Sequence, residues 1–185
     1  MSVVENTKEQ LLSSGVWSID PSHSTVEFRV KHMMIQTVRG RFRDFEGSII
    51  AGEDPAVAGS ISVASLETLN DERDAHLRSP DFFDIERFPQ IDFHAVGMHF
   101  DRDGRHFALP GELTIRGVTR PILLNGELRG SATDDEYGER LALGLSGQLD
   151  RSDYGLAWNR MLETGGLLVG DTVDLTLDIS AVRVY

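Results

Sequence analysis

The sequence contains no cysteine among its 185 residues. This absence excludes a disulfide framework, a thiolate metal site and a cysteine nucleophile. Basic residues are scarce as well, because 18 Lys and Arg stand against 30 Asp and Glu and leave a formal net charge of −12. Such a charge opposes binding to phosphate backbones and to anionic membrane surfaces. We therefore expect no nucleic-acid partner.

Long apolar runs are also missing. No stretch approaches the 18 or more apolar residues that a membrane-spanning helix requires, so we expect no transmembrane segment. The first residues, MSVVENTKEQLLSSG, are interrupted by charged side chains, unlike the apolar core of a secretory signal. This predicts a cytoplasmic location. Thr7 followed by Gln10 resembles a capping box and predicts a short helix over residues 8–13.

The clearest pattern present is alternation of polar and apolar residues, as in HSTVEFRVKH, residues 23–32. Period-2 alternation indicates a half-buried strand with Val26, Phe28 and Val30 on its inner face. His32 continues that face, so we expect it at the inner end of whatever the strand encloses. His23 points to the opposite face, so the two histidines cannot share a metal ion.

The next stretch, VRGRFRDFEGSII, changes its parity within the strand. Phe42 is apolar at an even position and Phe45 at an odd one, which predicts a bulge near Asp44 that bends the strand. If the even face is internal before the bulge, then Arg39, Arg41 and Arg43 point outward. We interpret these arginines as ordinary solvent-exposed residues rather than as a site of headgroup or partner recognition.

Similar alternating stretches follow to the C-terminus, with turn-forming segments such as DRDG and TDDEYGE between them. About eight long strands with hairpin connections predict one all-β domain, an extended eight-stranded antiparallel β-barrel. One or two short helices accompany it. Asn70 or Asp71 is the expected N-cap of a helix that stops before Pro80, and residues 158–170 form a loop or short helix over one barrel end.

Three stretches come close to catalytic or metal-binding motifs without matching them. Residues 101–112 lack the acceptor and glycine of a calcium loop, because Arg105 and His106 occupy those positions. GLSGQ has Gln148 in place of the last glycine of a nucleophile elbow. Histidines such as His94 and His99 show no metal-ligand spacing. We expect no catalytic residue, no metal and no cofactor.

Several longer stretches together resemble the YceI-like family of lipocalin-like polyisoprenoid-binding proteins. They are WSIDPSHSTVEFRVKH, VRGRFRDFEGSI, ERDAHLRSPDFFDIERFPQIDF, LPGELTIRGVTRPI and LDRSDYGL, in that order along the chain. The resemblance implies a YceI-like lipid-binding barrel domain over residues 17–185 after an N-terminal extension, residues 1–16. It also implies a lipocalin-like fold whose apolar interior holds a long isoprenoid chain.

A tunnel of apolar side chains binds such a chain without hydrogen bonds, since about 25 cal/mol is gained per Å² removed from water. The candidate ligand-lining residues are Phe28, His32, Phe42, Phe82, Phe83, Tyr154 and Trp158. We also expect Arg73 and Asp74 to hold the helix to the barrel, and Arg151 with Asp153 to fix the following loop.

The leading hypothesis is therefore a protein that binds, carries or sequesters an isoprenoid-type lipid, a polyprenyl compound or an isoprenoid quinone. Two alternatives remain open. One is an enzyme acting on an amphiphilic substrate of this type, with His32 and an inner carboxylate as acid and base. The other is a filled barrel with a structural or stress-related role. The sequence also leaves open whether the chain forms a homodimer.

Overall fold

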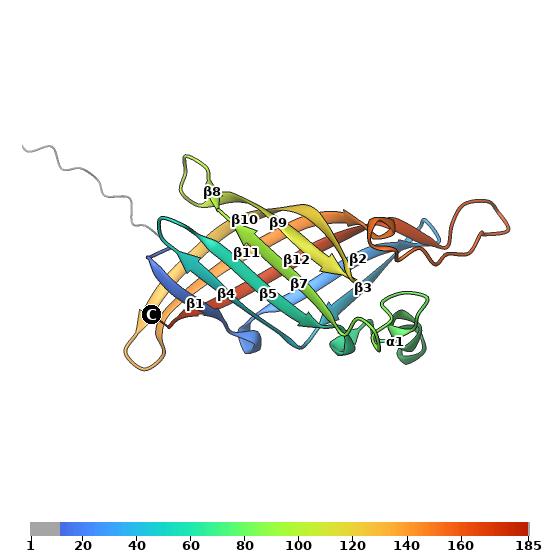
Figure 1. Cartoon of the computed structure of the whole chain (residues 1–185), viewed down its shortest axis with the longest axis horizontal. Helices are drawn as coiled ribbons and strands as arrows, with labels where there is room; N and C mark the ends of the chain where they lie inside the picture. The colour runs from blue at the N-terminus through green and yellow to red at the C-terminus, as the bar shows by residue number, and fades with distance from the viewer. Residues whose placement is uncertain (1–11, 185) are drawn as a thin grey trace, which may run out of the picture.

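The computed structural model describes residues 12–184, so most of the helix predicted at residues 8–13 lies outside the described residues. Twelve β segments and one α-helix build an elongated barrel (Figure 1). The β segments are β1 (Gly15–Ile19), β2 (Thr25–His32), β3 (Gln36–Phe42), β4 (Phe45–Ala51), β5 (Ala56–Ser62), β6 (Leu66–Glu67), β7 (Gln90–Val96), β8 (His99–Phe100), β9 (His106–Ile115), β10 (Val118–Asp134), β11 (Gly138–Asp150) and β12 (Val169–Arg183). Helix α1 spans Asp71–Arg78, and 3₁₀ turns span Pro21–His23, Val63–Ser65 and Arg151–Tyr154.

These segments amount to eight long antiparallel strands. β1 and β2 both pair with β12, one after the other along its length. On their opposite edges, β1 pairs with β4 and β2 pairs with β3. From β4 the ladder runs through β5, β7, β9, β10 and β11 back to β12, and thereby closes. The predicted eight-stranded antiparallel barrel is confirmed. Closure leaves no long unpaired sheet edge between first and last strands.

The predicted interruption near Asp44 is present. β3 ends at Phe42 and β4 begins at Phe45, and both phenylalanines are buried although their parity differs. The arginines predicted to face outward, Arg39, Arg41 and Arg43, are exposed. Glu67 binds two of them, at 2.7 Å from Arg41 Nε and 2.8 Å from Arg43 Nε. The parity argument therefore assigned the inner face of this strand correctly.

Helix α1 lies at one end of the barrel (Figure 1). Asn70 is its N-cap, as predicted, and its side chain accepts a hydrogen bond from Arg73 N at 2.9 Å. The expected roles of Arg73 and Asp74 are confirmed: the Asp74 carboxylate accepts bonds from the main-chain and side-chain donors of Thr68, and Arg73 donates to Thr68 as well. Thr68 directly follows β6, which pairs with β3, so these bonds fasten the helix to the barrel.

Among the described residues, no helix is long and apolar enough to cross a membrane.

The segment predicted as a loop or short helix, residues 158–170, forms a hairpin-like loop before β12. Met161 bridges Leu167, and Leu162 N donates to Gly166 O at 3.0 Å. The prediction that Arg151 fixes this loop together with Asp153 is wrong in its partner. Arg151 donates instead to four main-chain carbonyls, those of Leu156, Trp158, Val169 and Gly170, and its ion pair at 3.5 Å is with Asp171. A guanidinium suits this place because its planar fork reaches several acceptors at once.

Candidate functional site

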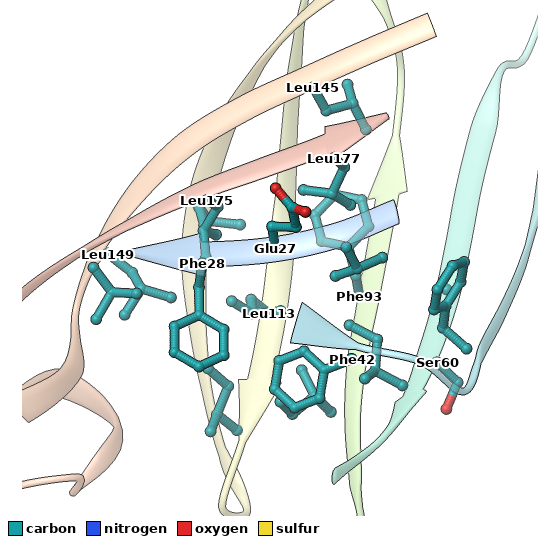
Figure 2. Close-up of a pocket in the computed structure, with 18 of the residues that line it drawn as sticks. Glu27, Phe28, Phe42, Ser60, Phe93, Leu113, Leu145, Leu149, Leu175 and Leu177 are labelled. Atoms are coloured by element: carbon teal, nitrogen blue, oxygen red, sulfur yellow. The ribbon is translucent and has the colours of Figure 1, made fainter. Parts of the chain in front are cut away.

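A cavity of about 210 Å³ lies inside the barrel. Figure 2 shows Phe28, Phe42 and Leu113 beside it, together with leucines from β11 and β12. The polar residues at its boundary are few: Glu27, Glu46, Ser60 and Arg151. A wall of this composition favours an apolar occupant, because it offers water few hydrogen-bond partners.

The inner lining comes mostly from residues of one parity on each strand. On β11 these are Leu145 and Leu149, and on β12 they are Leu175 and Leu177. The lining residues predicted from the sequence, which are aromatic apart from His32, do not include these leucines. The signal was available, since both strands alternate and their odd positions form one apolar face.

Three of the predicted aromatic residues form a connected group at the cavity wall. The ring of Phe28 lies 5.6 Å from that of Phe42, and Phe42 makes an edge-on contact with Phe83 at 6.2 Å between centroids. All three line the cavity. Gly40 makes room for this group, because a Cβ there would lie 2.2 Å from Cζ of Phe28. The structure thus brings together Phe28, Phe42 and Phe83 from two strands and the segment after α1.

A second pocket, of about 410 Å³, opens between α1 and the ends of β2 and β3. We call it the mouth pocket. His32 lines it, which places this histidine at the end of the barrel, half-buried, as the alternation predicted. The other lining residues are Phe28, Val30, Lys31, Val38, Asn70, Glu72, Arg73, His76, Leu77, Phe82, Trp158, Leu168 and Val169. Its polar side chains distinguish it from the cavity inside the barrel.

The two spaces share part of their walls. Phe28, Val30, Leu77, Phe82 and Val169 line both. These side chains therefore form a layer between the polar mouth and the apolar interior. A ligand with an apolar chain and a polar head matches that sequence of surfaces, since the chain loses contact with water inside while the head keeps polar neighbours.

His76 belongs to this mouth although it was not among the predicted lining residues. Its Nε2 lies 2.8 Å from Asp81 Oδ2. Its ring meets Trp158 edge-on at 4.6 Å and Phe82 at 5.2 Å between centroids. The hydrogen bond fixes the imidazole between the two aromatic rings, and the three rings together form one side of the mouth pocket. No local sequence pattern links position 76 to position 158.

Of two further residues predicted to line the ligand site, Trp158 does so and Tyr154 does not. Trp158 lines the mouth pocket, but Tyr154 lines neither space and is 2% exposed in the core of the barrel. Burial raises the pKa of the Tyr154 phenol. Burial also lowers the pKa of the neighbouring Arg151 guanidinium, whose carbonyl partners compensate for the loss of water. Both side chains therefore stabilise the barrel end beneath the loop of residues 158–168.

The remaining titratable groups do not form a metal centre in the part of the chain that the structure describes. No group of three His, Asp or Glu side chains there lies close enough to hold an ion. Asp103, in the segment first compared with a calcium loop, instead accepts hydrogen bonds from the main-chain N–H groups of Arg105 and His106 within a turn.

Comparison with known proteins gives consistent matches over most of the chain. A UPF0312 protein of Photorhabdus laumondii is 35% identical over 153 residues, which cover 80% of this chain and 79% of that protein. The crystal structure of Burkholderia cenocepacia BcnA has a TM-score of 0.75 at 18% identity, over 88% of this chain and 98% of the other. A polyisoprenoid binding domain from Saccharophagus degradans, implicated in plant cell wall breakdown, has a TM-score of 0.66 at 17% identity, over 91% and 98%.

At these identities the two solved structures support the fold. The family assignment comes from the sequence, because residues 17–181 match the YceI-like domain. The match begins at Trp17, a fully buried residue of β1, and ends at Ala181 near the end of β12. It therefore includes both strands that close the barrel and both spaces described above, and the chain belongs to the YceI-like family.

Proposed function

We propose that this protein binds an isoprenoid-type lipid, with the apolar chain in the inner cavity and the polar head at the mouth pocket. The observation that carries the proposal is a polar mouth pocket that shares a wall with an almost wholly apolar inner cavity. The barrel of Saccharophagus degradans, described as a polyisoprenoid binding domain, has the same fold and supports this by analogy.

The chemistry of the mouth narrows the choice of ligand. Phe82 and Trp158 each meet His76 edge-on and are tilted toward each other, and this group offers a flat head group a stacking or edge contact. We propose an isoprenoid quinone or a polyprenyl compound as the ligand. Binding, carrying and sequestering all require this site and no covalent step.

The alternatives have less support. A filled structural barrel does not account for an interior space of about 210 Å³. An enzyme needs a base and an acid near the ligand, yet within residues 12–184 no hydrogen bond joins His32 to a carboxylate, and Glu72 is the acidic side chain of its pocket. The cytoplasmic location stays a prediction from the sequence, which leaves the oligomeric state open.

Adding polyprenyl compounds of increasing length to delipidated protein tests this function. At a free ligand concentration 100 times the Kd, binding adds about 2.7 kcal/mol to the free energy of unfolding. For a domain of this size we expect Tm to rise by about 5 to 10 °C. At one fixed ligand concentration the rise should grow with chain length until the cavity is full, because each added methylene contributes about 0.8 kcal/mol to the binding free energy.

Fluorescence gives a second measurement on the same samples. The chain has two tryptophans, of which Trp17 is fully buried in the core and Trp158 lines the mouth. An added isoprenoid quinone should quench the Trp158 signal, and Trp158→Phe should remove that response. If neither Tm nor fluorescence changes at any chain length, the proposed function is wrong.

A further inference from the structure

Exposed apolar side chains gather around the opening of the mouth pocket. Half of the large apolar side chains that are exposed among the described residues belong to three short segments there. We call this set the mouth rim; it consists of Met33, Met34, Ile35, Leu69, Met161 and Leu167. A gathering of this kind on a polar protein surface marks a site of interaction.

Adjacency in sequence and one main-chain hydrogen bond place the rim at the opening of the mouth pocket. Each of its segments adjoins a residue that lines the mouth pocket: His32 precedes Met33, Asn70 follows Leu69, and Leu168 follows Leu167. Met33 N also donates to Leu168 O at 2.7 Å, so the turn between β2 and β3 lies beside the loop before β12. In Figure 1 that loop, coloured orange, projects beyond the barrel at the end where α1 lies.

The backbone of the turn is unfavourable for the residues that occupy it. Ile35 N donates to His32 O at 3.3 Å, and the two central residues have positive φ, 53° at Met33 and 63° at Met34. A turn with this geometry favours Asn followed by Gly. Leu69 is likewise strained, with φ of 60°. Fold stability therefore does not explain why exposed Met and Leu side chains stand at these positions.

The hairpin that carries the turn is locally cationic, although the whole chain has a net charge of −12. No acidic residue occurs between Phe28 and Arg43. Arg29 and Arg39 are directly opposite each other on β2 and β3, where like charges destabilise the pair. Lys31 lies next to them on the same outer face and donates to Thr37 at 3.1 Å. Asp174 of β12 lies opposite Arg29 on the other side of β2 and offsets part of this repulsion, and an anionic surface would relieve the rest.

Unlike the hairpin, the other two rim segments carry no excess of positive charge. Arg160 and Glu163 flank Met161, so the loop is balanced, and α1 begins with Asp71 and Glu72. The cationic hairpin is therefore the part of the rim that fits an anionic surface best. Its apolar tip and basic flank match the two layers of a bilayer interface, headgroup charge and acyl chain.

We propose that the mouth rim docks onto a phospholipid bilayer that contains anionic headgroups, with Met33 and Met34 entering the interface and Arg29, Lys31 and Arg39 facing the headgroups. Docking in this orientation turns the mouth pocket toward the membrane. A lipid can then pass between bilayer and barrel without crossing water, a use of the surface that rests on the proposed function.

The test uses the full chain and the double substitution Met33→Asn with Met34→Gly. This variant removes the apolar tip while giving the turn its preferred residues, so it should fold at least as stably as the wild type. In flotation with phosphatidylcholine vesicles containing 30% phosphatidylglycerol, we expect the wild type to bind and the variant to bind about tenfold more weakly. Val96→Ser, which removes an exposed apolar side chain at the end of β7, should bind like the wild type.

Three results would overturn the proposal: wild-type protein that does not float with these vesicles, a double variant that floats equally well, or binding that ignores salt and phosphatidylglycerol. The first would leave a protein partner as the occupant of the rim. Polyprenyl binding in solution is measured on the same proteins and separates the two claims. A variant that loses vesicle binding and keeps polyprenyl binding supports docking, whereas a wild type that binds vesicles and no polyprenyl compound contradicts only the proposed function.

Discussion

Replacing Gly59 with Phe should block the inner cavity and leave the barrel folded. Gly59 lines the cavity from β5, and a Cβ built there meets only Glu46 O, at 3.6 Å. A phenyl ring would occupy the volume of about three to four ligand methylenes, each contributing about 0.8 kcal/mol. We therefore expect the affinity for a polyprenyl chain to fall about 100-fold.

The effect on stability should be small or favourable, since a strand glycine is replaced and empty space is filled. Asn125→Phe is the matched control, because it adds the same ring at an exposed position of β10 that lines neither space. Titration of delipidated proteins with one polyprenyl compound measures the difference. Equal affinities of Gly59→Phe and the wild type would place the ligand outside the inner cavity.

Replacing Arg151 with Ala should lower the free energy of unfolding more than any other substitution proposed for this protein. Arg151 is 4% exposed, and its guanidinium donates to the carbonyls of Leu156, Trp158, Val169 and Gly170. Val169 O keeps a second donor, Asn159 Nδ2 at 2.7 Å, but the carbonyls of Leu156, Trp158 and Gly170 lose the guanidinium, which costs about 3 to 5 kcal/mol. For this chain length we expect Tm to fall by about 10 °C or more.

Arg151→Lys separates geometry from charge. An ammonium keeps the ion pair with Asp171 but cannot reach the same set of carbonyls as a planar fork. Most of the loss should therefore remain in Arg151→Lys, as measured by thermal unfolding. Full recovery would mean that the charge opposite Asp171, rather than the carbonyl contacts, holds the loop.

Much of the barrel could be predicted because its determinants are local. Alternation assigned the inner faces, and the change of parity between Phe42 and Phe45 located the bend at Asp44. The N-cap at Asn70 was also visible in the sequence, since the capping bond spans three residues.

The mouth of the barrel was harder to predict because it depends on contacts between distant segments. The ring of His76 meets Trp158 across 82 positions of sequence, and the carbonyl partners of Arg151 lie on both sides of the loop. Proximity in sequence instead predicted Asp153 as the partner of Arg151, and that prediction was wrong. Tyr154 falls in a stretch that resembles the YceI-like family, and its place in the core depends on packing that no local pattern shows.

The most direct test of the central claim is the identity of what the protein carries. The full chain is purified without detergent from the organism that encodes it, extracted into organic solvent, and the extract is analysed by mass spectrometry. We expect a lipid with an isoprenoid repeat at close to one molecule per barrel, and its loss in Gly59→Phe purified in the same way. An extract with only bulk membrane phospholipid, in substoichiometric amounts and equal in both proteins, would contradict the account.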